Sequence, residues 1–349
     1  MKKKNSTAQR KKVKFDNKYL GDPKIKRIYL TFKKQLYSQI KNQKFCIGVS
    51  GGPDSLALAF LGKIFSKEFN SKFIALIIDH NLRKQSAIEA RKVKKILTKH
   101  KIRTKILTWK GKIPKSNIQF NARNIRYFLL KKECNKLNVK NLVLAHHESD
   151  LIENFFIRLF RGSGLKGLSS LNIKRYPEDN VLNLIRPLIN TKKNELIYIS
   201  KKVFKFYLTD PSNFKEKFLR TRIRNYLDKF KLDGLDINKV KLTLSNLQSA
   251  NESINFYKEK SIKNYARYLQ SNECFVSYDL FNYESEEVIF RAISDIISKV
   301  SGKYYSPRGK NVKNLITGIQ SKKFNKATLG GCIVEKTHNI LIFRKEFGA

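Results

Sequence analysis

The feature that most constrains the fold is a buried-strand pattern that runs directly into a glycine turn and then into an apolar helix. Residues 45–49 (Phe-Cys-Ile-Gly-Val) are apolar without alternation, which favours a strand covered on both faces. Residues 50–55 (Ser-Gly-Gly-Pro-Asp-Ser) follow, and the apolar run from Leu56 to Phe65 indicates a helix. Glycines let backbone N–H groups approach a phosphate closely, and a helix N-terminus adds positive potential. The sequence therefore predicts an anion-binding loop.

This loop differs from two common phosphate-binding loops. A Walker loop requires Lys-Ser or Lys-Thr after its last glycine, and the dinucleotide fingerprint requires a third glycine; the sequence has neither. Two glycines alone are more often an ordinary turn. Strand, hexapeptide and helix together resemble Ser-Gly-Gly-x-Asp-Ser, the pyrophosphate loop of the N-type ATP pyrophosphatases, which split ATP between its α and β phosphates. The resemblance implies ATP binding by the loop residues Ser50, Gly51, Gly52, Pro53, Asp54 and Ser55.

Apolar runs alternate with helical periodicity through the first half of the chain. Further strands are predicted at residues 73–78, 104–109 and 141–145, and helices at residues 86–99, 118–137 and 150–160. Near-continuous Ile, Leu and Val runs interleaved with helices favour an α/β fold, a Rossmann-like parallel sheet covered on both faces. Ligands of such sheets bind beyond the carboxyl ends of the strands.

Polar clusters follow two of these predicted strands. Asp79 comes directly after the second strand, where it could be a turn residue or a nucleotide ligand. After the fourth strand, residues 145–154 hold two histidines together with Asp150 and Glu153, which lie one turn apart if a helix starts near residue 147. Such groups could bind a metal, perform acid–base chemistry or cap the helix. Zinc is disfavoured because the His-x-x-x-His spacing is absent, and an ATP loop at the same sheet edge favours acid–base work or Mg-ATP positioning.

The cluster after the fourth strand also carries a family resemblance. Residues 145–154, with the Arg-Gly-Ser-Gly-Leu-Lys-Gly-Leu run of residues 161–168, are similar to the His-His-x-x-Asp-Asp-Gln-x-Glu-Thr and Arg-Gly-Ser-Gly-Leu-x-Gly-Leu motifs of tRNA(Ile)-lysidine synthases. Five further motifs occur in the family's order, at residues 79–83, 122–127, 185–188, 210–213 and 220–224. The resemblance covers residues 44–230. Ser149, Leu151 and Asn81 depart from it, because the family has Asp, Gln and Gly there.

The resemblance implies an ATP-dependent ligase that joins free lysine to C2 of the wobble cytidine of the CAU-anticodon tRNA(Ile). An adenylated cytidine would form with release of pyrophosphate, and lysine would displace AMP to give lysidine, which changes codon reading from AUG to AUA. The residues implied as catalytic are Asp54, Arg123, His146 and Asp150. Asp79 and Glu153 would join the loop in ATP binding, and Mg²⁺ would accompany ATP near Asp54, with no structural metal.

A tRNA partner also agrees with the charge of the chain. Lys+Arg number 73 and Asp+Glu 28, a net charge of +45; crowding with Lys, Asn and Ile, as AT-rich coding produces, explains part of this excess. A polyanion such as nucleic acid is the natural partner of such a field, ahead of a membrane surface. The predicted tRNA-binding residues are Arg161, Lys166, Arg220, Arg222 and Arg224. The alternative for the last three is a solvated helical face, and Arg161 and Lys166 face the same choice.

The sequence predicts four parts: a basic flexible tail (residues 1–22), the PP-loop domain (23–215), a helical tRNA-binding or linker domain (216–300) and a small C-terminal domain (301–349). Residues 235–269 have a helical pattern. The stretches 327–334 and 340–343 are predicted as two strands of a β-hairpin that joins them near residues 338–339, as at the end of some proteobacterial lysidine synthases. By that analogy the later domains would measure tRNA arms.

The remaining features concern compartment and alternatives. Four scattered cysteines are typical of buried thiols in a reducing compartment, and the absence of a signal peptide or long apolar run predicts a cytoplasmic protein. Rival functions are another PP-loop tRNA enzyme such as a thiolase, which generally uses paired cysteines, a small-molecule amidating ligase, and a non-enzymatic RNA-binding protein. The oligomeric state stays open.

Overall fold

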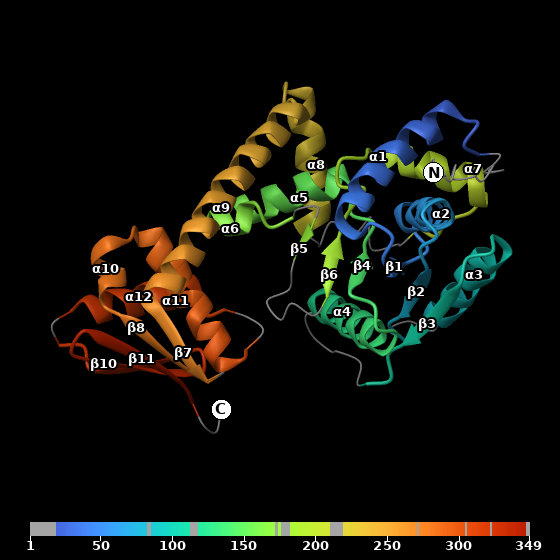
Figure 1. The fold of residues 1–349 in the computed structure, drawn as a ribbon. Coiled ribbons are helices and arrows are strands. Elements are labelled where there is room, and N and C mark those ends of the chain that lie inside the picture. Colours follow the sequence, from blue (N-terminus) through green and yellow to red (C-terminus); the bar gives the residue numbers. More distant parts are fainter. Residues whose placement is uncertain are drawn as a thin grey trace, which may run out of the picture. The chain divides into compact units, whose positions relative to one another are not determined.

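The structure is a computed structural model that describes residues 19–81, 85–111, 118–171, 174–175, 182–209, 219–270, 272–303, 306–321 and 323–346. The chain divides into two compact units (Figure 1). The first lies within residues 1–162 and 170–236, and the second within residues 163–169 and 237–349. Of the predicted basic tail, residues 1–18 lie outside the described residues. The assignment of 163–169 to the second unit is not indicated by the sequence pattern.

The first unit is built on a six-stranded sheet. Its order is β3 (Thr104–Thr108), β2 (Phe73–Asp79), β1 (Phe45–Val49), β4 (Asn141–Val143), β6 (Asn183–Ile185) and β5 (Lys174–Arg175). The first five strands are parallel and β5 is antiparallel, which confirms the predicted parallel α/β fold. Chain order reverses between the neighbours β1 and β4, so their carboxyl ends flank the topological switch point where such sheets bind ligands.

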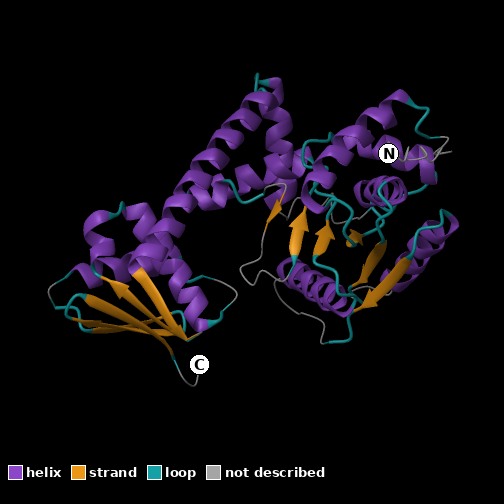
Figure 2. Cartoon of the chain, viewed as in Figure 1, coloured by secondary structure: helices purple, strands orange, loops and turns teal. Residues whose placement is uncertain are grey.

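Helices cover both faces of this sheet (Figures 1 and 2). One face packs against α1 (Pro23–Ile40), α2 (Pro53–Glu68), α3 (Ser86–Lys99) and α7 (Lys193–Phe204). The other face packs against α4 (Ile118–Lys136), with Leu130 and Cys134 of α4 in the same core as Cys46 of β1. α1 begins after Asp22, whose carboxylate accepts the Lys24 and Ile25 N–H groups as an N-cap.

Two further helices of the first unit pack on each other. They are α5 (Glu148–Leu159), which follows β4, and α8 (Leu219–Leu232). Ile223 and Leu227, four residues apart, form the buried side of α8. α5 begins at the switch point, so its first turn lies beside the glycine loop of β1.

The second unit is an α+β layer (Figure 2). Its sheet has the antiparallel order β7 (Ala266–Gln270), β8 (Glu273–Ser277), β11 (Ile340–Lys345), β10 (Cys332–Thr337) and β9 (Lys326–Leu329). Its helices are α6 (Leu165–Leu168), α9 (Ile237–Tyr265), α10 (Asp279–Tyr283), α11 (Glu286–Ser301) and α12 (Gly309–Gln320). Alternate residues of β8, β10 and β11 are buried against the helices, as the period of two predicts.

Two details of this unit differ from the sequence prediction. The predicted helical stretch 235–269 ends as a helix at Tyr265, because residues 266–270 pair with β8. The predicted strand 327–334 is two strands, since Gly330 and Gly331 both have positive φ and turn the chain between β9 and β10. The predicted hairpin at residues 338–339 is confirmed, with His338 in the left-handed region between β10 and β11.

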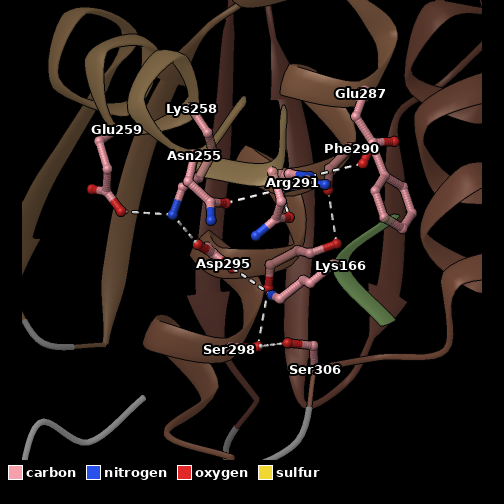
Figure 3. Close-up of polar contacts among 12 residues, drawn as sticks. Lys166, Asn255, Lys258, Glu259, Glu287, Phe290, Arg291, Asp295, Ser298 and Ser306 are labelled. Atoms are coloured by element: carbon pink, nitrogen blue, oxygen red, sulfur yellow. Dashed lines mark hydrogen bonds and ion pairs between the residues drawn. The ribbon is translucent and has the colours of Figure 1, made fainter. Parts of the chain in front are cut away.

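Buried polar side chains join α9 to α11 within the second unit (Figure 3). Lys258 Nζ lies 2.6 Å from Asp295 and 2.6 Å from Glu259. The fully buried Arg291 donates to Glu287 and to two asparagines of α9. These contacts hold α9 and α11 together.

The described cysteines Cys46, Cys134, Cys274 and Cys332 are buried thiols, as predicted. No helix among the described residues is both long and apolar enough to span a bilayer.

Candidate active site

The loop after β1 is held in shape by a serine from the helix that follows it. Ser55 Oγ accepts hydrogen bonds from the N–H groups of Ser50 and Gly51, both at 3.2 Å, and donates to the Gly52 carbonyl at 2.9 Å. α2 begins directly after Gly52, with Pro53 at its first position. A hydroxyl oxygen thus already lies where loop N–H groups converge, which is the chemistry a phosphate oxygen requires.

Gly51 is the loop position that only glycine can occupy. Its φ is +87°, and a Cβ built there would lie 2.6 Å from Val93 of α3 and 2.8 Å from Leu208. The Leu208 N–H also donates to the Gly51 carbonyl at 2.9 Å. The loop therefore needs both the conformational freedom and the missing side chain of glycine.

His147 joins the loop helix to α5. Its Nε2 lies 3.5 Å from Asp54 Oδ2 and 3.5 Å from Asp150 Oδ2, so one imidazole stands between two carboxylates from neighbouring strand ends. Burial opposes a charge on His147, but the two carboxylates outweigh burial and raise its pKa. Asp54 Oδ1 is buried with no hydrogen-bond partner among the described residues. His147 was not among the site residues predicted from the sequence, whereas its neighbour His146 was.

Asp150 keeps its charge in this position. Its carboxylate accepts the backbone N–H of His147 at 3.2 Å, as part of a capping box at the start of α5. Burial favours the neutral acid, but the nearby cations, chiefly His147, lower the pKa of Asp150 below its usual value. The structure thus brings Asp54 and Asp150 together around the imidazole of His147, as the strand order predicts.

Glu153, one turn further along α5, is almost fully buried and binds two arginines of α8. Arg220 Nε lies 2.9 Å from Glu153 Oε2, and Arg224 Nε lies 2.5 Å from Oε1. Arg220 also lies 3.5 Å from Asp150. Arg220 and Arg224 are four residues apart and share one face, whereas the exposed Arg222 lies on the opposite side of α8. Two of the three arginines of α8 that were predicted to meet tRNA therefore hold a carboxylate of the site.

The other two residues predicted to bind tRNA are not on α8. Arg161 is exposed just beyond the end of α5. Lys166 belongs to α6 of the second unit, where its Nζ lies 3.7 Å from Asp295 Oδ1 (Figure 3). A tRNA contact of either residue stays a prediction.

His146 has a partner that sequence reasoning missed. Arg186, directly after β6, is 2% exposed, and its Nε donates to His146 Nδ1 at 3.2 Å. The pKa of His146 is lowered to about 3, and burial is the largest cause. The charge of Asp150 raises this pKa, whereas the charges of Arg186, Arg123 and Arg220 lower it further. His146 is therefore neutral at physiological pH. The Arg-Pro-Leu motif was the only sequence signal for Arg186, and it carried no role.

Arg123 lies on α4 with its guanidinium carbon 5.2 Å from the centre of the Tyr127 ring. Its charge lowers the pKa of His146, so its field reaches the cluster at the switch point. The side chain is exposed. Arg123 can therefore meet an anion that enters from solvent.

Asp79 takes the turn role that was one of its two predicted readings. Its Oδ1 accepts the Asn81 N–H at 3.0 Å and the Ser86 hydroxyl at 2.7 Å, which ties the end of β2 to the start of α3. Asn81 has φ +52°, in the left-handed region. Asn adopts this region more readily than most other residues, so it can replace the family's glycine here. ATP binding by Asp79 stays a prediction. Residues 82–84 and the Asp-Pro-Ser-Asn motif at 210–213 lie outside the described residues.

The geometry defines a class of protein. A Ser-Gly-Gly-Pro-Asp-Ser loop at the switch point of a parallel sheet is a PP-loop, and residues 26–230 match the family described as PP-loop domain. Curated relatives are tRNA(Ile)-lysidine synthases: that of Orientia tsutsugamushi is 34% identical over 88% of this chain and 71% of its own length. That of Rickettsia felis is 33% identical over 92% and 74%, and that of Wolbachia pipientis wMel is 33% identical over 88% and 72%. The chain belongs to the tRNA(Ile)-lysidine synthase family.

A solved structure shares the fold. The U34-tRNA thiolase of Methanococcus maripaludis aligns with a TM-score of 0.56 and 19% identity, over 66% of this chain and 79% of that one. At this identity the likeness concerns the fold alone.

Proposed function

We propose that this chain ligates free lysine to C2 of the wobble cytidine of the CAU-anticodon tRNA(Ile) in the cytoplasm. ATP is consumed to AMP and pyrophosphate through an adenylated cytidine, and the lysidine formed changes codon reading from AUG to AUA. Family membership supports the reaction. The observation that carries it is the imidazole of His147, which lies between Asp54 of the glycine loop and Asp150 of α5.

The loop residues fit the phosphates of ATP. Backbone N–H groups of Ser50 and Gly51 converge on Ser55 Oγ, whose place a phosphate oxygen would take. Ser50 Oγ lies 3.3 Å from Ser55 Oγ, and the first turn of α2 adds positive potential. Gly52 and Pro53 set the entry of α2. Asp54 suits the Mg²⁺ that accompanies ATP, because one of its carboxylate oxygens is buried without a partner and a hard cation prefers such an oxygen. Mg²⁺ would supply charge neutralisation at the phosphates.

The carboxylates of α5 suit the lysine step. The side-chain amine of lysine has an unperturbed pKa near 10.4 and arrives as an ammonium, which a negative site attracts. Asp150 is ionised and lies beside the ATP loop, so it can position that ammonium near the adenylated base. Its low pKa makes Asp150 a positioning anion more than a strong base. Ser149, one residue earlier and half-buried, gives the site one carboxylate where the family has two.

Arginines supply the cationic side of the site. Arg220 touches both Asp150 and Glu153, and Arg123 is exposed within electrostatic range of His146. Phosphate charge that develops as pyrophosphate leaves would be stabilised by such guanidiniums. Arg222, on the outer side of α8, suits a tRNA phosphate.

The test is incorporation of labelled lysine into a transcript of tRNA(Ile) with the CAU anticodon. Expected are lysidine with ATP-dependent AMP and pyrophosphate release, and no incorporation into a methionine tRNA with the same anticodon. Asp54→Asn should abolish product, whereas Asp228→Asn, on the exposed side of α8, should leave the rate unchanged. Sulfur incorporation, or ATP cleavage that needs no tRNA, would overturn the proposal in favour of a thiolase or an amidating ligase.

Binding to tRNA is tested separately through salt. If Arg222 meets a phosphate, Arg222→Gln lowers the slope of log affinity against log salt by about one, uniformly across tRNAs. An affinity of the wild type that does not change between low and moderate salt would contradict phosphate binding.

A further inference from the structure

Arg186 stands beside His146 because of the sheet register. β4 and β6 are parallel neighbours with Val143 opposite Ile185, and the Leu144 N–H donates to the Ile185 carbonyl at 2.9 Å. Both strands end at the same edge of the sheet, so His146 and Arg186 follow adjacent strand ends. The bond between them is a product of the fold and joins residues 40 positions apart.

The chain after Arg186 is also tied to the active-site helix. The Arg186 carbonyl accepts the Ile189 N–H at 3.2 Å, and the Thr191 carbonyl accepts the N–H of Glu148, the first residue of α5, at 3.1 Å. Arg186 is itself 2% exposed, so its guanidinium has little freedom to choose another direction. The donor that faces His146 is therefore fixed from both sides.

The chemistry of this bond has one outcome. A guanidinium stays protonated and has donors but no acceptor, so Arg186 Nε–H can only donate. Nδ1 of His146 must then present its lone pair, and a neutral imidazole with Nδ1 unprotonated carries its hydrogen on Nε2.

We infer that Arg186 is a positioning residue that fixes His146 as a neutral imidazole, with its one proton on Nε2 as a hydrogen-bond donor and no nitrogen available as a base. The sequence left acid–base chemistry open to this cluster, and the Nδ1 contact removes the role of base from His146. Within the proposed function, on which this step rests, Nε2–H would donate to an oxygen that gains negative charge during adenylyl transfer.

The electrostatics agree with the geometry. The charged groups that act on His146 come from four elements: Arg123 on α4, Asp150 on α5, Arg186 after β6 and Arg220 on α8. Three of the four groups are cations that lower the pKa of His146, and burial lowers it as well. A second proton on the imidazole would face the Arg186 N–H directly, so the cationic form of His146 is disfavoured.

The first test reads the tautomer in the full chain without substrate. The chain has five histidines, so ¹⁵N-histidine labelling with two-bond ¹⁵N–¹H correlation gives few signals, and His146→Gln identifies those of His146. We expect His146 to be the neutral Nε2–H tautomer and to stay neutral down to pH 5. Arg186→Met should give mixed tautomers and a pKa of His146 above that of the wild type, since one of its lowering causes is removed while burial remains. A His146 that is cationic at pH 6.5, or carries its proton on Nδ1, or is unchanged in Arg186→Met, overturns the inference.

The second test is kinetic. His146→Gln places an amide N–H near the Nε2 position, whereas His146→Asn places it near Nδ1, so Gln should retain more kcat than Asn. Arg186→Met should lower kcat roughly 10- to 100-fold with the KM for ATP unchanged, and should move the acid limb of the pH profile upward. Arg186→Lys should restore part of kcat. Equal kcat for the Gln and Asn variants contradicts a donor at Nε2.

Two controls separate positioning from folding. Arg291 is equally buried, but in the second unit, so Arg291→Met should cost stability without moving the His146 signals. If Arg186→Met fails to fold, Arg186→Gln, which keeps a donor without the charge, takes its place in the titration; a neutral Nε2–H tautomer must then persist. A chain with the expected spectra but no lysidine would contradict the proposed function and leave the tautomer assignment standing.

Discussion

Replacing Glu153 by Gln removes the charge that holds α8 on α5. The carboxylate side chain is 3% exposed and has three contacts: Arg220 Nε at 2.9 Å, Arg224 Nε at 2.5 Å and Arg224 Nη2 at 3.2 Å. A hydrogen bond to a charged group contributes about 1.5–3 kcal/mol, and the amide keeps one acceptor oxygen. The guanidiniums, 43% and 29% exposed, recover hydration when the pair is broken, which reduces the loss. We therefore expect α8 to be destabilised by about 2–3 kcal/mol.

The assay is native-state hydrogen exchange of α8, because a two-unit chain need not unfold in one step. A loss of about 2–3 kcal/mol corresponds to exchange roughly 30- to 150-fold faster for amides that open locally. The matched control is Asp228→Asn on the same helix, whose carboxylate is 72% exposed and pairs with Lys231; this pair should be worth about 0.5 kcal/mol or less.

A double-mutant cycle separates the ion pair from other effects of the substitution. Glu153→Gln and Arg224→Gln should couple by about 1 kcal/mol or more, since each removes the same bidentate contact. If Glu153→Gln accelerated exchange no more than Asp228→Asn, or if the two substitutions were additive, Glu153 would not be what fixes α8, and the reasoning from burial and bond count would be refuted.

Further outcomes follow from backbone conformation and pH. Gly51→Ala should destabilise the fold by about 2 kcal/mol or more and abolish ATP binding, whereas Gly164→Ala, whose Cβ would meet nothing within 4 Å, should be near neutral in thermal unfolding. Asn81→Gly should be tolerated, and Asn81→Val should cost about 1–2 kcal/mol, because φ is +52°; equal melting temperatures for the two would contradict this. The pKa of His146 is lowered to about 3 in the folded chain. Its contribution to the free energy of unfolding is therefore fully present above pH 6.5 and is lost as the pH falls below that value. In His146→Gln the slope of the free energy of unfolding against pH should be smaller between pH 5 and 6.5, by up to about 1.4 kcal/mol per pH unit. Equal slopes for wild type and variant would contradict the low pKa of His146.

The sequence predicted those parts of the site that lie along single stretches of chain. The hexapeptide loop, the parallel strands and the side-by-side Asp150 and Glu153 all depend on local spacing, and the structure confirms the fold that this spacing favoured. The strand after Tyr265 was missed because residues 266–269 continue an apolar pattern that a helix also satisfies; pairing with β8 decides the outcome.

Contacts between distant segments were not predictable. The bonds of His146 to Arg186 and of Glu153 to Arg224 join residues 40 and 71 positions apart, and they depend on which strand lies beside which. Arg220 and Arg224 share one face of α8, but the side chain that they meet belongs to another helix. The family resemblance therefore suggested tRNA contacts where two of the arginines bind a carboxylate.

The pairing of charges explains how this site can hold carboxylates and phosphates together. Asp54, Asp150 and Glu153 gather at one sheet edge, where an unpaired carboxylate about 4 Å from a phosphate would be repelled by roughly 4 kcal/mol at an effective dielectric of 20. Each carboxylate instead has a partner, either the imidazole of His147 or an arginine of α8, so part of the negative charge of the cluster is balanced before any ligand arrives. An incoming ammonium can take a carboxylate from its present partner, and the released guanidinium is then available to phosphate. Ion pairs that can exchange partners in this way suit the proposed reaction, whose substrates would be an ammonium and two polyanions.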